Sequence, residues 1–269
     1  MNGAPRRIWG LMYRHIALYR RSWPRLLELA YWPILQMCIW GFTSTWMVQR
    51  TGGGVGGATL AAAGALLGGV LLWEVALRSQ MGMSLSFLEE LWSRNLGHVF
   101  VSPLRPWEML AALVGMSTLR VLVGVLPAMV LAWVLYAFDI LALGPVLVLF
   151  FLNLMVMGWW VALGVISLIL RHGAGAEALA WSILFGLTPV SAVFYPVGVL
   201  PAWLQPVALA LPSAHVFEGM RAALAGQIRW DHMAWATLLN IGWMAAAMLL
   251  FARQFRAART SGALLSIGE

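Results

Sequence analysis

The sequence predicts an all-α membrane protein that crosses the bilayer several times. Hydrophobic residues make up 62% of the 269 positions, charged residues make up only 10%, and the mean hydropathy is +0.83. A soluble domain carries about 25% charged residues, so this chain has too few charges to cover a water-exposed surface. The sequence contains six apolar runs, and each has roughly the 20 residues that a membrane-spanning helix needs. They lie at 26–47, 57–78, 109–136, 145–170, 178–196 and 232–252.

Arginine distribution predicts how these spans are oriented. All 17 basic residues are arginine, and the formal net charge is +7. Segments on one side of the predicted spans carry Arg6, Arg7, Arg14, Arg20, Arg21, Arg25, Arg78, Arg94, Arg105, Arg171, Arg253, Arg256 and Arg259, whereas the other side carries Arg50, Arg221 and Arg229. Basic residues accumulate in cytoplasmic loops. Both termini are therefore expected in the cytoplasm. Because the arginines flank apolar runs, they favour lipid headgroups over nucleic acid as a partner.

Residues 1–25 are predicted to form a helix that lies along the membrane surface. Apolar residues at helical spacing fall on one face, namely Ile8, Met12, Ile16, Tyr19 and Trp23. Arg7, Arg14 and Arg21 fall on another face, and Pro24 is expected to end the helix. An amphipathic helix of this kind binds in the headgroup layer. The alternative is a plain cytoplasmic start of the first span.

A polar insert separates the second and third apolar runs. The insert reads "EELWSRNLGHVFVSPLRPWEML", residues 89 to 110, and the helical segment expected in this region covers about 86–104. Glu89 to Val99 can form a short helix with one apolar side, lying parallel to the membrane on the cytoplasmic face. Such a helix is suited to docking in the groove of a partner protein.

The segment of about 197–226 is too polar and too rich in proline to span a membrane. It predicts two short helices, about 201–210 and 213–225, which enter the outer leaflet and return; a loop on the headgroups is the alternative. The residues expected to form a gate here are Tyr195, Pro196, His215, Glu218 and Arg221. His215 and Glu218 are compatible with a proton relay, but a local hydrogen-bonded cap is favoured.

Taken together, these features resemble the permease subunits of ABC-2 type exporters, a family that includes nodulation-factor, daunorubicin and polysaccharide exporters. The resemblance rests on the insert, on "FYPVGVLPAWLQPVALALPSAHVFEGMR", and on the order of the elements. It implies that the insert is a coupling helix seated in a separate ATPase subunit. The residues in that contact would be Glu89, Glu90, Trp92, Arg94 and Asn95.

The same resemblance implies two permeases, expected to be a homodimer, working with two cytoplasmic ATPases. It also implies a multi-pass location in a bacterial inner (plasma) membrane. Because the family's first, second and fifth spans face the dimer axis, the candidate substrate-path residues are Thr43, Ser44, Thr188 and Ser191.

No catalytic, metal or cofactor site is predicted in this chain. A phosphate-binding P-loop requires a lysine after its glycines, and the sequence contains no lysine. No two histidines have the i, i+4 spacing of a metal site, and Cys38 is the single cysteine. ATP and Mg²⁺ would therefore be bound by the partner subunit.

Two charges lie inside predicted spans, Glu74 in the second and Arg120 in the third. Charges at membrane depth are costly, so we expect the two to pair or share a polar network. Such a pair either locks the two spans together or acts as a hinge.

The whole pattern predicts a transmembrane domain at 26–252 and a cytoplasmic tail at 253–269. The expected function is ATP-driven export of an amphiphile, which would be a lipid, a lipid-linked glycan or a hydrophobic drug. A non-transporting scaffold and an intramembrane enzyme are the alternatives.

Overall fold

The computed structural model describes residues 3–20, 22–50, 56–93 and 104–260, and this part of the chain contains helices and no β-strand. The α-helices are α1 (Ala4–Arg20), α2 (Trp23–Arg50), α3 (Gly56–Trp92), α5 (Pro106–Tyr136), α6 (Val146–His172), α7 (Leu179–Leu187), α8 (Gln205–Leu209), α9 (Pro212–Leu224) and α10 (Trp230–Thr260). Short 3₁₀ helices connect them: η1 (Ile140–Leu143), η2 (Gly173–Ala176), η3 (Thr188–Val190) and η4 (Val197–Val199).

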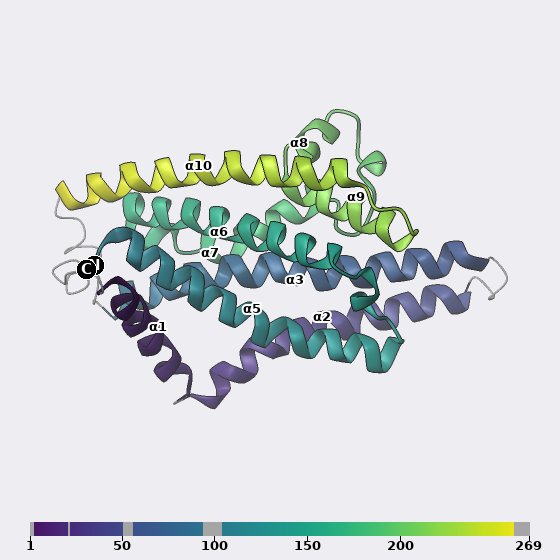
Figure 1. Ribbon diagram of the computed structural model, residues 1–269, viewed down its shortest axis with the longest axis horizontal. Coiled ribbons are helices and arrows are strands. Elements are labelled where there is room, and N and C mark those ends of the chain that lie inside the picture. Colours follow the sequence, from purple (N-terminus) through teal and green to yellow (C-terminus); the bar gives the residue numbers. More distant parts are fainter. Residues whose placement is uncertain (1–2, 21, 51–55, 94–103, 261–269) are drawn as a thin grey trace.

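Helices α3 and α6 form the centre of the bundle (Figure 1). Both are apolar around most of their circumference, and helices of this kind are buried. Helix α3 packs against α2, α5 and α6, while α10 covers α6. The close approach of α3 and α6 depends on Gly158, where a Cβ atom would lie 2.7 Å from the carbonyl oxygen of Ala76.

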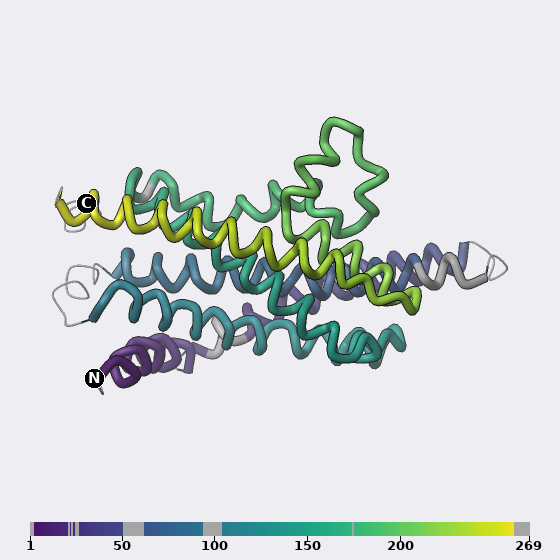
Figure 2. The backbone as a smooth tube through the Cα atoms, turned by 45° about the horizontal axis from the view of Figure 1, so that its top comes forward, coloured from purple at the N-terminus to yellow at the C-terminus, as the bar shows by residue number. Residues whose placement is uncertain are grey.

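The two ends of the bundle carry the segments that the arginine distribution predicts to lie on opposite sides. Helix α1, the end of α3, the start of α5 and the end of α10 lie at one end (Figures 1 and 2). The end of α2 and the start of α3 lie at the other end. The assignment of the first end to the cytoplasm remains a prediction.

Four helices in the described ranges are long and apolar enough to cross a membrane: Ala62–Trp92, Pro106–Tyr136, Val146–His172 and Trp230–Thr260. Helix α2 has 28 residues but is more polar. The predicted fifth span is not one continuous helix, since α7 ends at Leu187 and η3 follows it. Pro189 lacks the N–H group that a continuing helix requires. The chain is thus a polytopic helical membrane protein, and the six-span arrangement stays a prediction.

Helix α3 differs from the expectation at its end. It continues to Trp92, past the predicted end of the second span at residue 78. Glu89 and Trp92 therefore belong to the last turns of α3, and the predicted start of a separate helix at Glu89 is wrong. Residues 94–103 of that predicted helix lie outside the described residues. At the start of α2, Pro24 occupies the first turn, where a missing N–H is tolerated.

Candidate functional site

Charged contacts fasten α1 to the ends of α3 and α5. The Nε atom of Arg7 donates to Glu108 Oε2 at 2.9 Å, and its Nη2 atom donates to the other carboxylate oxygen. Arg14 donates to Glu90 Oε2 at 2.6 Å, and His15 Nδ1 lies 3.1 Å from Glu89 Oε2. We call this set the α1 clasp. Its members are Arg7, Arg14, His15, Glu89, Glu90 and Glu108.

The α1 clasp changes the expected roles of these charges. Arg7 and Arg14, predicted to face the lipid headgroups, pair with acids inside the protein. The Glu108 carboxylate also accepts a hydrogen bond from the backbone N–H of Arg105 at 2.9 Å. It thereby satisfies one of the backbone donors left open at the start of a helix.

The residues expected to contact the ATPase fall into three groups. Glu89 and Glu90 bond to α1, and Glu90 is only 3% exposed, so Glu90 is not available to a partner while α1 covers it. Trp92 is 52% exposed and remains available. Arg94 and Asn95 lie outside the described residues.

Arg120 connects the α1 clasp to the interior of the bundle. Its Nη1 atom donates to the carbonyl oxygen of Gly82 at 3.0 Å, and its Nη2 atom lies 3.3 Å from Glu89 Oε2. The guanidinium also lies over the Tyr19 ring, 4.7 Å from its centroid. Arg120 is 2% exposed, and its Nε atom has no hydrogen-bond partner among the described residues.

The predicted ion pair between Glu74 and Arg120 is wrong. Glu74 Oε2 instead accepts from Arg78 Nε at 3.2 Å, one turn further along α3. The i, i+4 spacing is the standard arrangement for an ion pair within a helix. Arg120 is directed to Glu89 instead, so both charges are neutralised, but by different partners.

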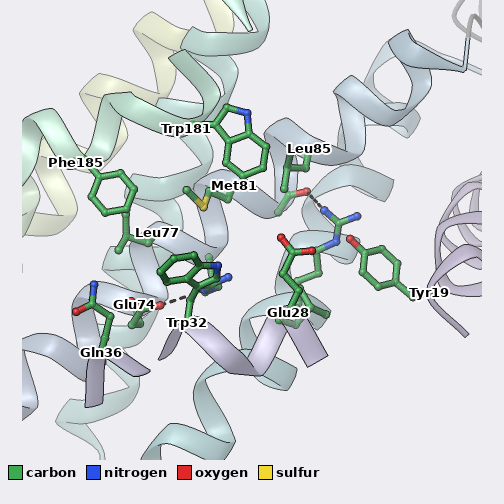
Figure 3. Close-up of a pocket in the computed structure, with 14 residues that line it drawn as sticks. Tyr19, Glu28, Trp32, Gln36, Glu74, Leu77, Met81, Leu85, Trp181 and Phe185 are labelled. Atoms are coloured by element: carbon green, nitrogen blue, oxygen red, sulfur yellow. Dashed lines mark hydrogen bonds and ion pairs between the residues drawn. The ribbon is translucent and has the colours of Figure 1, made fainter. Parts of the chain in front are cut away.

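A cavity of about 260 Å³ lies between α2, α3, α5 and α7, and we call it the central cavity. Figure 3 shows Trp181 and Phe185 on one side, Trp32 and Gln36 on the other, and Leu77 between them. Its charged lining residues are Glu28, Glu74, Arg78 and Arg120. Aromatic walls with a few placed charges are typical of ligand sites.

A second cavity, of about 350 Å³, adjoins the central cavity. The two share the lining residues Gln36, Glu74, Leu77 and Phe185. The second cavity adds residues closer to the other end of the bundle: Val70, Trp40, Trp73, Thr188, Pro189 and Phe194. Together they form one groove between α2 and α7 along α3, which we call the α2–α7 groove.

Of the four predicted path residues, Thr188 lines the α2–α7 groove. Thr43, Ser44 and Ser191 line neither cavity. Their hydroxyl groups donate to carbonyl oxygens in the preceding turn, as Ser191 does to Leu187 at 2.9 Å. In helices, serine and threonine commonly satisfy their hydroxyl groups in this way.

Three of the predicted gate residues, Tyr195, Glu218 and Arg221, make hydrogen bonds that cap the segment before α10. Glu218 Oε1 accepts from the backbone N–H of Val197 at 2.7 Å, and Arg221 Nη1 donates to the carbonyl oxygen of Ala192 at 3.0 Å. The Tyr195 hydroxyl donates to the carbonyl of Pro189 at 2.6 Å, and Pro196 precedes η4. These bonds satisfy backbone groups of an irregular segment. His215 contacts the carbonyl oxygen of Leu209 instead, and the gate role of these residues stays a prediction.

A family model described as "ABC-2 type transporter" matches residues 6–225, from α1 to the end of α9. The chain belongs to the ABC-2 type transporter family. The resemblance in the sequence is thus confirmed, and the chain is a permease component of an ABC transporter. Family membership implies that the permease associates with an ABC ATPase. No curated protein matches the chain.

Several contacts and lining residues of the permease were not predicted from the sequence. The partners of Arg7 and Arg14 could not be found, because the acids lie far away in the sequence. The Glu74–Arg78 pair could have been found from its i, i+4 spacing. Trp181 and Phe185 have the same i, i+4 spacing on α7, and both line the groove.

Within the described ranges, no group of three or more His, Cys, Asp or Glu residues is placed to hold a metal ion.

His215 gives the permease a testable pH dependence. Burial lowers the pKa of His215, while its Nε2 atom lies 3.0 Å from the carbonyl oxygen of Leu209 and its Nδ1 atom lies 3.4 Å from His232 Nδ1. Because the unfolded chain takes up the proton first, at a pKa of about 6.5, stability is fully present above that pH and falls as the pH drops below it. Thermal unfolding of the purified permease between pH 7.5 and 5.5 measures this loss.

The His215→Gln variant should lose less stability over the same pH range. His172→Gln, which replaces an exposed histidine at the end of α6, should retain the wild-type pH dependence. Equal pH dependence in the wild type and His215→Gln would contradict the role given to His215.

Proposed function

We propose that this permease exports an amphiphile from the cytoplasm or the inner leaflet as a homodimer, with two cytoplasmic ATPase subunits that bind ATP and Mg²⁺. The observation that carries the proposal is the α2–α7 groove, whose walls are aromatic and apolar and whose centre holds the Glu74–Arg78 pair. A molecule with an apolar body and a polar head matches this lining. The bacterial inner membrane is the proposed location.

The ATPase is proposed to bind where α3 ends and α5 begins. Two tryptophans are exposed there, Trp92 and Trp107, each at 52%. Aromatic residues of this kind are enriched at the centres of protein interfaces. The α1 clasp lies beside them, so a force on this end would move α1, α3 and α5 together.

Arg120 offers a physical route from this end to the groove. It contacts Glu89 of the α1 clasp and lines the central cavity. Movement of the α3 end would therefore reach the lining of the groove through one side chain. Substrate would leave past the cap formed by Tyr195, Glu218 and Arg221, which lies beyond Pro189 and Phe194 of the second cavity.

Replacing Trp92 with alanine should weaken binding of the ATPase subunit. Removing a tryptophan at an interface hot spot costs about 2 kcal/mol or more, which corresponds to a roughly 30-fold or larger rise in Kd. The measurement is the affinity between purified permease and ATPase. Trp235→Ala removes an exposed tryptophan of α10 (55%) as a control and should leave Kd unchanged. Equal affinity of wild type and Trp92→Ala would remove Trp92 from the interface.

Reconstitution tests the proposed function as a whole. The permease and the ABC ATPase that copurifies with it are placed in lipid vesicles, and ATP-dependent movement of labelled lipids and hydrophobic drugs is measured. ATP-dependent export of an amphiphile is the expected result. ATPase binding without any ATP-dependent movement would favour the scaffold alternative and contradict the proposal.

A further inference from the structure

The charges that line the central cavity are balanced between two acids and two bases. Glu74 and Arg78 neutralise each other at 3.2 Å. The other acid and base, Glu28 and Arg120, come from α2 and α5 and line the same cavity, and Arg120 also contacts Glu89 through Nη2. Figure 3 places Glu28 beside Tyr19, the ring that stacks on the Arg120 guanidinium, away from Gln36 and Phe185.

Arg120 has a donor that the described residues leave unused. Its Nη1 and Nη2 atoms bond to Gly82 and Glu89, but Nε is buried without an acceptor. A buried donor without a partner is unfavourable, and in native proteins buried donors bond to protein groups, to water or to a ligand. An oxyanion of a ligand would satisfy this donor with a charge-assisted hydrogen bond.

Glu28 provides the complementary group. Its side chain is exposed in the opening of the central cavity, where its carboxylate can accept hydrogen bonds from an ammonium group. An anionic headgroup alone would lie against Glu28, and a cationic headgroup alone would leave the Arg120 Nε atom without an acceptor. A headgroup that carries both charges satisfies both residues.

We infer that the central cavity binds an amphiphile with a zwitterionic headgroup, in which a phosphate oxygen accepts from Arg120 Nε and a neighbouring ammonium contacts Glu28. The acyl chains lie along the aromatic wall formed by Trp32, Trp181 and Phe185. A phospholipid with an ethanolamine headgroup has this chemistry. The inference rests on the proposed function, because it names the substrate class for the same groove.

Lipid binding to the permease alone tests the inference without the ATPase. Purified permease is delipidated in detergent, and retention of phosphatidylethanolamine and of phosphatidylglycerol is measured by native mass spectrometry. The wild type should retain one phosphatidylethanolamine per chain with about tenfold higher affinity than phosphatidylglycerol, a difference typical of one charged contact. Equal affinities would overturn the inference.

Glu28→Gln should remove most of this preference while leaving phosphatidylglycerol binding unchanged or stronger. Because Glu28 is exposed, the variant is expected to fold. Glu177→Gln, outside the cavity, is the matched control and should keep the wild-type preference. A Glu28→Gln variant with the full wild-type preference would overturn the inference.

The lipid-binding and export experiments can fail separately. A permease that retains phosphatidylethanolamine as described but exports nothing with its ATPase contradicts the proposed function and supports the binding site. A permease that exports another amphiphile and shows no preference for phosphatidylethanolamine contradicts the binding site alone.

Discussion

Replacing Gly158 with alanine should destabilise the permease by about 3 kcal/mol, the upper end of the usual cost of overpacking. The new Cβ atom would lie 2.6 Å from Ser79 Cβ, 2.7 Å from the Ala76 carbonyl oxygen and 2.8 Å from the Gln80 backbone nitrogen. Ser79 and Gln80 are 0% and 1% exposed. Backbone atoms cannot move aside as a flexible side chain does, so α3 and α6 must separate.

Gly164→Ala on the same helix is the matched control. Nothing lies within 4 Å of a Cβ atom at that position. Alanine in a helix interior is favoured over glycine by roughly 0.5–1 kcal/mol, so this variant should unfold at the wild-type temperature or slightly above it. Thermal unfolding of both variants in the same detergent checks the prediction. A Gly158→Ala variant as stable as Gly164→Ala would contradict the close approach of α3 and α6.

Reversing the charge of Glu90 should uncouple ATP hydrolysis from transport. Glu90→Arg places a cation against Arg14, whose guanidinium now lies 2.6 Å from the carboxylate, and next to His15. Repulsion would then separate α1 from the end of α3. Coupling free energies between sites are typically 1–3 kcal/mol, equivalent to roughly 5–150-fold. ATP-driven transport should therefore fall by roughly 5–150-fold, while hydrolysis by the complex continues.

The reciprocal change tests whether the pair itself is responsible. The Arg14→Glu, Glu90→Arg double variant restores opposite charges and should recover most of the lost transport. Arg6→Glu reverses an exposed charge on the same helix and serves as the control, with transport close to wild type. Wild-type transport in Glu90→Arg, or no recovery in the double variant, would show that the α1 clasp does not carry the coupling.

The sequence was sufficient to predict the helical class and the membrane location. Both follow from the length and composition of the apolar runs, which need no knowledge of neighbours in space. The sorting of arginine-rich segments to one end of the bundle follows from the same local information. The match to the ABC-2 family extends from α1 to α9 and agrees with the motifs quoted from the sequence.

The partners of the charged residues could not be predicted as well as the helical class. A helical wheel places Arg7 and Arg14 on a polar face but cannot distinguish a lipid phosphate from Glu108 or Glu90 as the partner. The polar residues at the end of α3 were expected to begin a separate helix. In the structure the acids in the last turns of α3 have α1 and Arg120 as partners.

The residues that line the α2–α7 groove were predicted only in part. Four hydroxyl residues were expected to line a path because the family's first, second and fifth spans face the dimer axis. Their hydroxyl groups instead bond to carbonyl oxygens in the preceding turn, and of the four, Thr188 alone lines the groove. The lining is mostly aromatic and apolar, and its polar and charged residues include Gln36, Glu28, Glu74, Arg78, Arg120 and Thr188. The apolar residues that line the groove are determined by how α2 and α7 pack beside α3. The spacing of residues within either helix does not predict this packing.

Opening of the α2–α7 groove during transport can be tested with a reversible cross-link. Trp40 of α2 stacks on Phe194, with ring centroids 4.6 Å apart, and both residues line the groove. Cysteines at these two positions, in a Cys38→Ala background, can be joined by a short reducible reagent. A second pair, at Met12 and Gly115, ties α1 to α5 within the unit expected to move together, since a Cβ atom at Gly115 would lie 2.8 Å from Met12 Sδ.

ATP-driven transport by the reconstituted complex is then measured before and after reduction. Cross-linking positions 40 and 194 should stop transport, and reduction should restore it, whereas the link between positions 12 and 115 should leave transport intact. Undiminished transport with the groove cross-linked would contradict the proposal that substrate passes between α2 and α7.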